Sequence, residues 1–383
     1  MRRVRWTLPI VLLAAASMSA GPAAQAAPAK VRVVAAEDFW GSIARQLGGD
    51  RADVTSLIAD PNTDPHDYEA KPSDGVATAR AQVAIVNGIG YDGWMAKLVA
   101  ANPSSSRKVV IVGDVVGVKD GGNPHQWYSP RSVNAVIDAV TDALKQADPA
   151  DAGYFDTQRQ TFRTDDLKRY NDLRAQIKAQ FGGVPVGASE SIFAPLAEDL
   201  GLKLLTPESF LDAIAEGNDP TAGDKATVDE QITGKQIKVF VYNSQNSTPD
   251  VDALADKARK AGIAVTTVTE TLVPAGASFQ DWQADQLQKL ADALAQSTGK
   301  TASSVGAAQA APATQSADAA APPPATAAAA AAGAGTTSTG GLARTGASAR
   351  RLVPLGGAVL VLGGLGLAGG AARRRNRRPL RGA

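Results

Sequence analysis

Short apolar runs alternate with longer amphipathic segments between residues 28 and 300. The apolar runs are rich in valine and isoleucine, which is typical of buried parallel strands, and we expect strands at Val31–Val34, Val54–Leu57, Val83–Val86, Val109–Val112, Val184–Gly187, Leu202–Leu205, Lys238–Tyr242 and Ala264–Val268. Segments with helical spacing lie near residues 38–48, 73–80, 92–100, 130–146, 191–200, 225–233, 249–261 and 279–296. This alternation predicts an α/β protein with two lobes, 28–150 and 183–300, each with a mostly parallel β-sheet flanked by helices.

The segment between the two lobes has a different pattern. Residues 151–180 contain no proline and no glycine apart from Gly153, and apolar side chains recur there at helical spacing. A helix of about 28 residues would be roughly 42 Å long, enough to cross from one lobe to the other. We therefore expect one long rigid α-helix over residues 151–182 to join the lobes, in place of a flexible hinge.

The N-terminal end and the region after residue 300 have compositions unlike the lobes. Residues 1–27 combine three arginines, an apolar run and small residues before an A-x-A site, which is typical of a secretory signal peptide. Residues 301–341 consist almost entirely of alanine, threonine, serine, glycine, proline and glutamine. Such a segment buries too little apolar surface to offset its chain entropy, so we expect a disordered stalk.

Residues 342–383 combine three features in a fixed order. The sequence LARTG precedes an apolar run from Leu352 to Ala372, which is long enough to span a bilayer as a transmembrane anchor, and six arginines follow it. This order resembles a sortase sorting signal of the Leu-Ala-x-Thr-Gly type. The resemblance implies that a sortase cleaves between Thr345 and Gly346 and attaches Thr345 to the cell wall of a Gram-positive bacterium.

Charge and cysteine content narrow the possible functions. The chain has no cysteine, which excludes disulfides, thiolate metal sites and a lipidated N-terminal cysteine. Removal of the eleven arginines in the signal peptide and in the tail after Thr345 leaves 28 basic residues against 38 acidic ones, a net charge of about −10. A secreted acidic domain argues against a nucleic-acid partner and is compatible with cation binding.

Both histidines of the chain follow a proline in turn-rich loops after predicted strands. His66 follows the second strand, His125 follows the fourth, and Glu190 and Glu270 follow the first and last strands of the second lobe. Because ligands bind beyond the carboxyl ends of parallel strands, these four side chains are candidate ligands for a borderline divalent ion such as Zn(II), Mn(II) or Fe(II). On the residues alone, ordinary loop histidines and solvated carboxylates at helix starts stay open as alternatives.

Several strings of residues resemble a known family. DPHDYEAKPSD (64–74), VAIVNGIGYDGWMAKL (83–98) and NPHQWYSP (123–130) are similar to the solute-binding proteins of bacterial ABC importers for zinc and manganese, some of which are called adhesins. The resemblance covers residues 30–297 and implies a metal buried between two lobes and passed to an ABC permease with its ATPase. It assigns the ligand roles to His66, His125, Glu190 and Glu270.

The sequence departs from the family pattern at a few positions. Glu270 stands where the family usually has Asp, and residues 113–123 are too short for the His-rich loop of many zinc importers. Two histidines with a glutamate at the third position favour a manganese-type ligand set, although zinc also fits such donors. Asp67, Asp74 and Gln126 are candidates for orienting the imidazoles.

These features predict a monomeric surface receptor, not an enzyme, that carries one Zn(II) or Mn(II) ion. A metallohydrolase would need an open metal position and a general base, and four protein ligands leave little room for either. A surface adhesin or wall protein with the same fold would fit the stalk and the sorting signal equally well.

Overall fold

The computed structural model describes residues 29–61, 63, 68–246 and 248–300. The predicted signal peptide, His66, Asp67, the stalk and the sorting signal with Thr345 and Gly346 lie outside the described residues. Among the described residues, no helix is both long enough and apolar enough to cross a membrane.

The N-terminal lobe is built on a four-stranded parallel sheet with the strand order β2-β1-β3-β4. Its elements are β1 (Val31–Glu37), α1 (Asp38–Gly48), β2 (Ala52–Ile58), α2 (Pro72–Arg80), β3 (Val83–Val86), α3 (Gly93–Ala101), β4 (Lys108–Ile111), α4 (Val112–Val116) and α5 (Pro130–Ala147). The central strand β1 is buried on both faces because helices cover the sheet on either side, as expected for parallel strands.

The C-terminal lobe repeats this arrangement with the order β6-β5-β7-β8, again all parallel. Its elements are β5 (Pro185–Ala188), α8 (Ala194–Asp199), β6 (Lys203–Leu204), α9 (Glu208–Ala215), α10 (Ala222–Thr233), β7 (Val239–Asn243), α11 (Pro249–Lys260), β8 (Ala264–Val268) and α12 (Phe279–Thr298). The expectation of two parallel-sheet lobes flanked by helices is confirmed. The sequence pattern missed the short helix α9.

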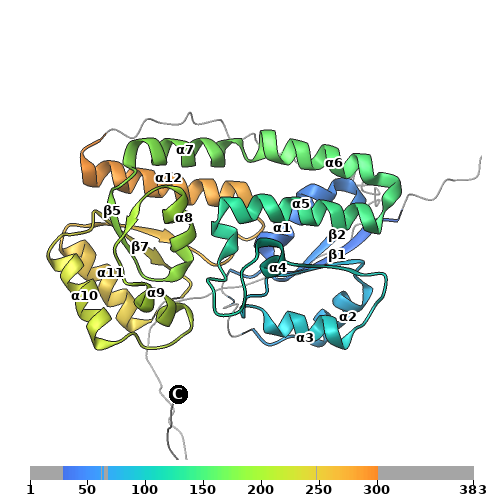
Figure 1. Cartoon of the computed structure of the whole chain (residues 1–383), viewed down its shortest axis with the longest axis horizontal. Coiled ribbons are helices and arrows are strands. Elements are labelled where there is room, and N and C mark those ends of the chain that lie inside the picture. Colours follow the sequence, from blue (N-terminus) through green and yellow to red (C-terminus); the bar gives the residue numbers. More distant parts are fainter. Residues whose placement is uncertain (1–28, 62, 64–67, 247, 301–383) are drawn as a thin grey trace, which may run out of the picture. The chain divides into compact units, whose positions relative to one another are not determined.

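The segment between the lobes is helical but is not one uninterrupted α-helix. It consists of α6 (Ala152–Thr161), a π-helical segment (Phe162–Asp166) and α7 (Lys168–Phe181). Phe162 and Leu167 are five residues apart, and both are buried. The Leu167 N–H donates to the Phe162 carbonyl and closes a π turn, which is wider than an α turn. This turn brings the two side chains onto the same face. α6 lies along α5 and α7 lies along α12, so the segment packs on both lobes (Figure 1).

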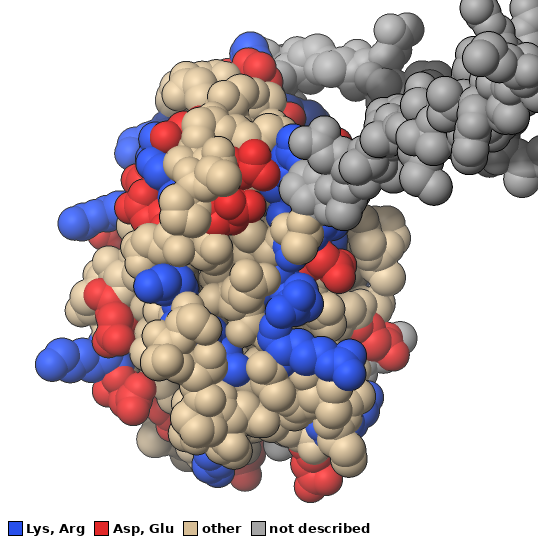
Figure 2. All heavy atoms as spheres, turned by 90° about the vertical axis from the view of Figure 1, so that its right-hand side faces the viewer, with Lys and Arg blue, Asp and Glu red and all other residues tan. Residues whose placement is uncertain are grey.

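One continuous hydrophobic core runs through both lobes and the linking helices. It includes Val33 of the first sheet, Phe162 and Ile177 of the linker, and Val239 of the second sheet. On the face of the protein shown in Figure 2, basic and acidic side chains are interspersed. That face therefore lacks the extended basic surface that binds nucleic acid.

Candidate metal centre

The structure brings three of the four predicted ligands together. Glu190 lies two residues beyond β5, Glu270 two residues beyond β8, and His125 in the loop between α4 and α5. One donor atom from each side chain lies within 4.8 Å of the others. The Nε2 atom of His125 is 3.3 Å from Oε1 of Glu190 and 3.7 Å from Oε2 of Glu270.

These donors are withdrawn from solvent. His125 is 0% exposed, and Glu190 and Glu270 are each 1% exposed. Two carboxylates that share a buried space repel each other unless a cation or a proton lies between them. The arrangement therefore favours occupation by a positive charge.

Asn243, the last residue of β7, holds both carboxylates from the strand between them. Its Nδ2 donates to Oε2 of Glu190 (2.5 Å) and to Oε1 of Glu270 (2.8 Å). The Tyr91 hydroxyl, from the N-terminal lobe, donates to Oε2 of Glu270 (3.0 Å). Burial, followed by the charges of Glu270 and Glu37, raises the pKa of Tyr91, so the phenol keeps its proton and remains a donor.

Asn123 orients the imidazole of His125. Its Nδ2 donates to the backbone carbonyl of Ser191 (2.7 Å), which can only accept, and this fixes which end of the amide is oxygen. The Oδ1 atom lies 2.9 Å from both the backbone nitrogen and Nδ1 of His125. Nδ1 must then carry the proton, which leaves the Nε2 lone pair directed at the two carboxylates.

Of the three residues suggested from sequence for this orienting role, Asp67 lies outside the described residues, and neither Asp74 nor Gln126 has a described hydrogen bond to the imidazole of His125. Asp74 binds the backbone N–H of Lys71 and the hydroxyl of Tyr68 at the start of α2. Gln126 donates to the backbone carbonyl of Asn123 and thus supports the loop without reaching the imidazole.

Aromatic side chains exclude water behind His125. The ring of Trp127 lies 5.2 Å from the imidazole and stacks on Phe39 at 3.9 Å between centroids. Both aromatic residues are 0% exposed. An apolar wall of this kind strengthens electrostatic attraction between an ion and the buried donors.

Sequence reasoning missed a group of buried acids at the ends of β1 and β3. Burial, with the charges of Asp92 and Asp38, raises the pKa of Glu37 well above its usual range, and both of its carboxylate oxygens lack a hydrogen-bond partner among the described residues. Burial raises the pKa of Asp38 to about 7 although the backbone N–H of Leu272 opposes the shift, and burial raises the pKa of Asp92 to about 6. Glu37 and Asp38 stand at the carboxyl end of β1, where ligands bind in such sheets, and this position is the signal that could have found them.

The donor set limits the ions that fit. One imidazole nitrogen and two carboxylates suit zinc, manganese or iron, whereas calcium prefers an oxygen-only shell. Because the donors come from both lobes, an ion bound by all three would tie the lobes together.

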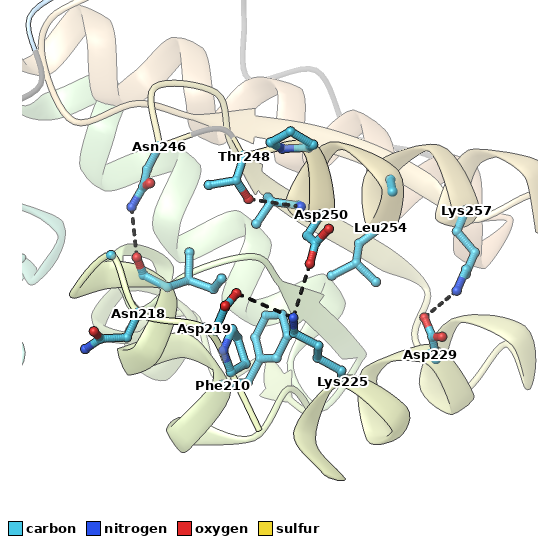
Figure 3. Close-up of a pocket in the computed structure, with 16 residues that line it drawn as sticks. Phe210, Asn218, Asp219, Lys225, Asp229, Asn246, Thr248, Asp250, Leu254 and Lys257 are labelled. Atoms are coloured by element: carbon cyan, nitrogen blue, oxygen red, sulfur yellow. Dashed lines mark hydrogen bonds and ion pairs between the residues drawn. The ribbon is translucent and has the colours of Figure 1, made fainter. Parts of the chain in front are cut away.

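A separate cavity of about 680 Å³ lies in the C-terminal lobe, away from these donors (Figure 3). Its two lysines are already paired: Lys225 Nζ lies 3.1 Å from Asp250 Oδ2, and Lys257 contacts Asp229. The cavity takes no part in the metal centre.

Most of the two-lobed part of the chain matches a known protein family. Residues 33–293, more than half of the chain, match the family model ZnuA, described as zinc-uptake complex component A, periplasmic. The iron-binding protein YfeA of Yersinia pestis is 28% identical over 185 residues, which is 45% of this chain and 58% of YfeA. The alignment thus spans little more than half of that relative.

A longer alignment and a solved structure extend the comparison. The manganese ABC transporter substrate-binding lipoprotein PsaA of Streptococcus mitis is 25% identical over 263 residues, covering 63% of this chain and 80% of PsaA. The Mn-bound periplasmic metal binding protein from Candidatus Liberibacter asiaticus superposes with a TM-score of 0.56 at 21% identity. The superposition covers 68% of this chain and 98% of the other. At that identity the structural match supports the fold.

Proposed function

Because this chain belongs to the ZnuA family of periplasmic metal-uptake components, we propose that it captures one divalent transition metal ion and delivers it to an ABC importer. The partners in this proposal are a permease and its ATPase. The single observation that carries the proposal is the cluster of His125, Glu190 and Glu270, which are buried together at the junction of the two lobes.

The cage geometry favours capture over catalysis. Asn243 donates to one oxygen of each carboxylate, Tyr91 donates to the other oxygen of Glu270, and the imidazole is held by Asn123. A hydrolytic metal needs an open coordination position for water and room for a substrate. A closed set of buried donors is suited to holding an ion and releasing it when the lobes part.

We propose His66 as the fourth ligand, although it lies outside the described residues. It follows β2 in the sequence, and β2 ends at the same edge of the sheet as the other strands of the N-terminal lobe. With His66 the donor set becomes two imidazoles and two carboxylates. The two negative charges of the carboxylates balance the two positive charges of a divalent ion.

Zinc and manganese are the proposed cargo. The two carboxylates favour a hard ion such as Mn(II), and the imidazoles bind Zn(II) strongly in the Irving–Williams order. The name of the related PsaA specifies manganese, and the name of YfeA specifies iron. Both names are consistent with a family in which similar donors serve several metals.

We propose an extracytoplasmic location for the receptor. Residues 1–27 have the pattern of a signal peptide, and the LARTG sequence with Thr345 and Gly346 has the pattern of a sortase substrate. A covalent wall anchor would hold the receptor near its permease and raise the effective concentration of the complex.

Calorimetry with Zn(II) and with Mn(II) on metal-free protein tests the function. We expect one ion per chain, with binding weakened at least about 100-fold in His125→Ala and in His66→Ala. Glu230→Gln on the exposed face of α10 is the matched control and should bind as the native protein does. A stoichiometry other than one, or tight binding that survives both histidine substitutions together, would contradict the assignment.

A further inference from the structure

The buried donors can receive an ion only if some part of the protein opens. A cavity of about 820 Å³ lies between the lobes and is lined by residues of both. Three of them contact the metal centre directly: Tyr91 donates to Glu270, Asn123 binds His125, and the Ser191 hydroxyl lies 3.4 Å from Nδ1 of His125. The cavity therefore leads from solvent to the outer side of the donors.

Two residues that line this cavity are joined by a hydrogen bond between the lobes. Asn123 of the N-terminal lobe donates to the backbone carbonyl of Ser191, which directly follows Glu190 in the C-terminal lobe. The same amide accepts from His125 through its oxygen. One side chain thus connects the imidazole of one lobe to the segment that carries a carboxylate of the other.

The charge along the cavity suits a cation. Glu208, Asp212 and Glu216 lie at four-residue spacing along α9 and just beyond its end, and all three line the wall of the cavity. A cleft lined by charges of one sign raises the local concentration of the opposite ion.

We propose that Asn123 is the latch of the metal centre and that the interlobe cavity is the route by which the ion enters and leaves. This proposal rests on the proposed function. Breaking the bond from Asn123 to Ser191 separates the two loops that carry His125 and Glu190 and exposes the donors to the cavity. When the bond forms again, the imidazole is already in the tautomer that binds the ion.

Two substitutions distinguish the donor role of the Asn123 amide from its acceptor role. Asn123→Ala removes both the support of His125 and the bond between the lobes. Asn123→Asp keeps an oxygen that accepts from His125 but cannot donate to the Ser191 carbonyl. We expect faster ion association in both variants, by about tenfold for the loss of one hydrogen bond, and a clear loss of equilibrium affinity only in Asn123→Ala.

Stopped-flow fluorescence on the full chain, with Zn(II) alone as the probe, measures the association rate. Trp127 lies 5.2 Å from His125 and reports on the site. Dissociation is followed after an excess of EDTA is added. Repeating the association at high salt removes steering by the added charge of Asn123→Asp, so acceleration that persists there comes from the lost bond.

Gln280→Ala is the matched control. Gln280 on α12 exchanges hydrogen bonds with Gln46 on α1, so its loss removes interlobe contacts remote from the cavity. Association in this variant should equal that of the native protein. Equal acceleration in Gln280→Ala would show general loosening of the lobes and overturn the latch.

The remaining outcomes are also distinct. Unchanged association in both Asn123 variants, with native metal binding intact, would overturn the latch and leave the proposed function standing. If Asn123→Ala fails to fold, the Asn123→Asp variant decides alone. Absence of metal binding by the native protein would overturn the proposed function, and the latch with it.

Discussion

The two lobes have the same strand order but contribute different chemistry to the metal centre. In both sheets the four strands are parallel, and the order β2-β1-β3-β4 of the first corresponds to the order β6-β5-β7-β8 of the second. The N-terminal lobe supplies the imidazole of His125, while the C-terminal lobe supplies the carboxylates of Glu190 and Glu270. Among these three ligands, the carboxylate charge therefore comes from one lobe, and the other lobe supplies a neutral, directional donor.

Two asparagines show how equivalent positions serve these different tasks. Asn87 directly follows β3 and Asn243 ends β7, and both are fully buried. Asn87 accepts from the indole of Trp40 and donates to the backbone carbonyl of Pro124, so it holds the loop of His125. Asn243 donates to the two ligand carboxylates themselves. The same type of side chain thus stabilises a backbone loop in one lobe and the charge of the ligands in the other.

The largest effect should come from removing charge in the C-terminal lobe. In Glu190→Gln we expect Mn(II) affinity to fall roughly 1,000-fold, or about 4 kcal/mol, because a buried anion opposite a cation is lost. His125→Ala removes a neutral donor and should cost less, about 100-fold. Competition against a chelator of known affinity measures both. An equal or larger loss in the histidine variant would break the comparison between the lobes.

The next largest effect on metal affinity is expected at Asn243, with Asn87 as the comparison. Asn243→Ala should lower metal affinity by about 10- to 100-fold, since the carboxylates lose the group that orients them. Asn87→Ala should instead lower the melting temperature of the metal-free and the metal-bound protein by the same amount. Calorimetric scans of both variants, with and without metal, separate the two patterns. A change in metal affinity in Asn87→Ala that matches Asn243→Ala would show that the two amides do the same work.

A last effect, on stability and not on metal affinity, concerns the buried acid Asp38 of the N-terminal lobe. Its pKa of about 7 exceeds the unfolded value near 4, so its contribution to stability is full below about pH 4 and is lost as the pH rises through about 7. Asp38→Asn keeps an acceptor for the Leu272 N–H. It should flatten the pH dependence of the unfolding free energy of the metal-free protein by up to about 1.4 kcal/mol per pH unit between pH 4 and 7.

Urea unfolding at a series of pH values checks this prediction. Glu230→Gln, at an exposed position, supplies the control for the loss of an ordinary carboxyl group. An unchanged slope in Asp38→Asn would show that Asp38 titrates near its usual range in the folded protein.

Much of the fold followed from local patterns. The runs at residues 83–86 and 264–268 form strands with the predicted bounds. Residues 83–86 are apolar throughout because a strand buried on both faces tolerates few polar residues, and residues 264–268 are rich in the β-branched residues valine and threonine. The linker was harder, since the five-residue spacing from Phe162 to Leu167 fits a π turn and departs from α-helical spacing. Helix α9 was missed because its eight residues offer too short a window for helical periodicity.

Part of the candidate site could be predicted from the sequence. His125, Glu190 and Glu270 were singled out because each follows a strand and because the flanking residues resemble a known family, and the structure brings them together. Asn123, Tyr91 and Asn243 were missed as neighbours of the candidate ligands. Amides and phenols are common in loops, and nothing local marks the one whose hydrogen bonds end on a ligand.

The sequence by itself determined which residue types were available: two histidines, no cysteine and acids placed after strands. It also determined two sheets of the same kind, because strand and helix periodicity are local properties of the chain. Only the tertiary structure decided that Asn123 reaches Ser191, 68 residues away, and that Asn243 lies between two carboxylates. Such contacts depend on how the lobes pack against each other, and packing is set by the whole core, whereas periodicity is set by neighbouring residues.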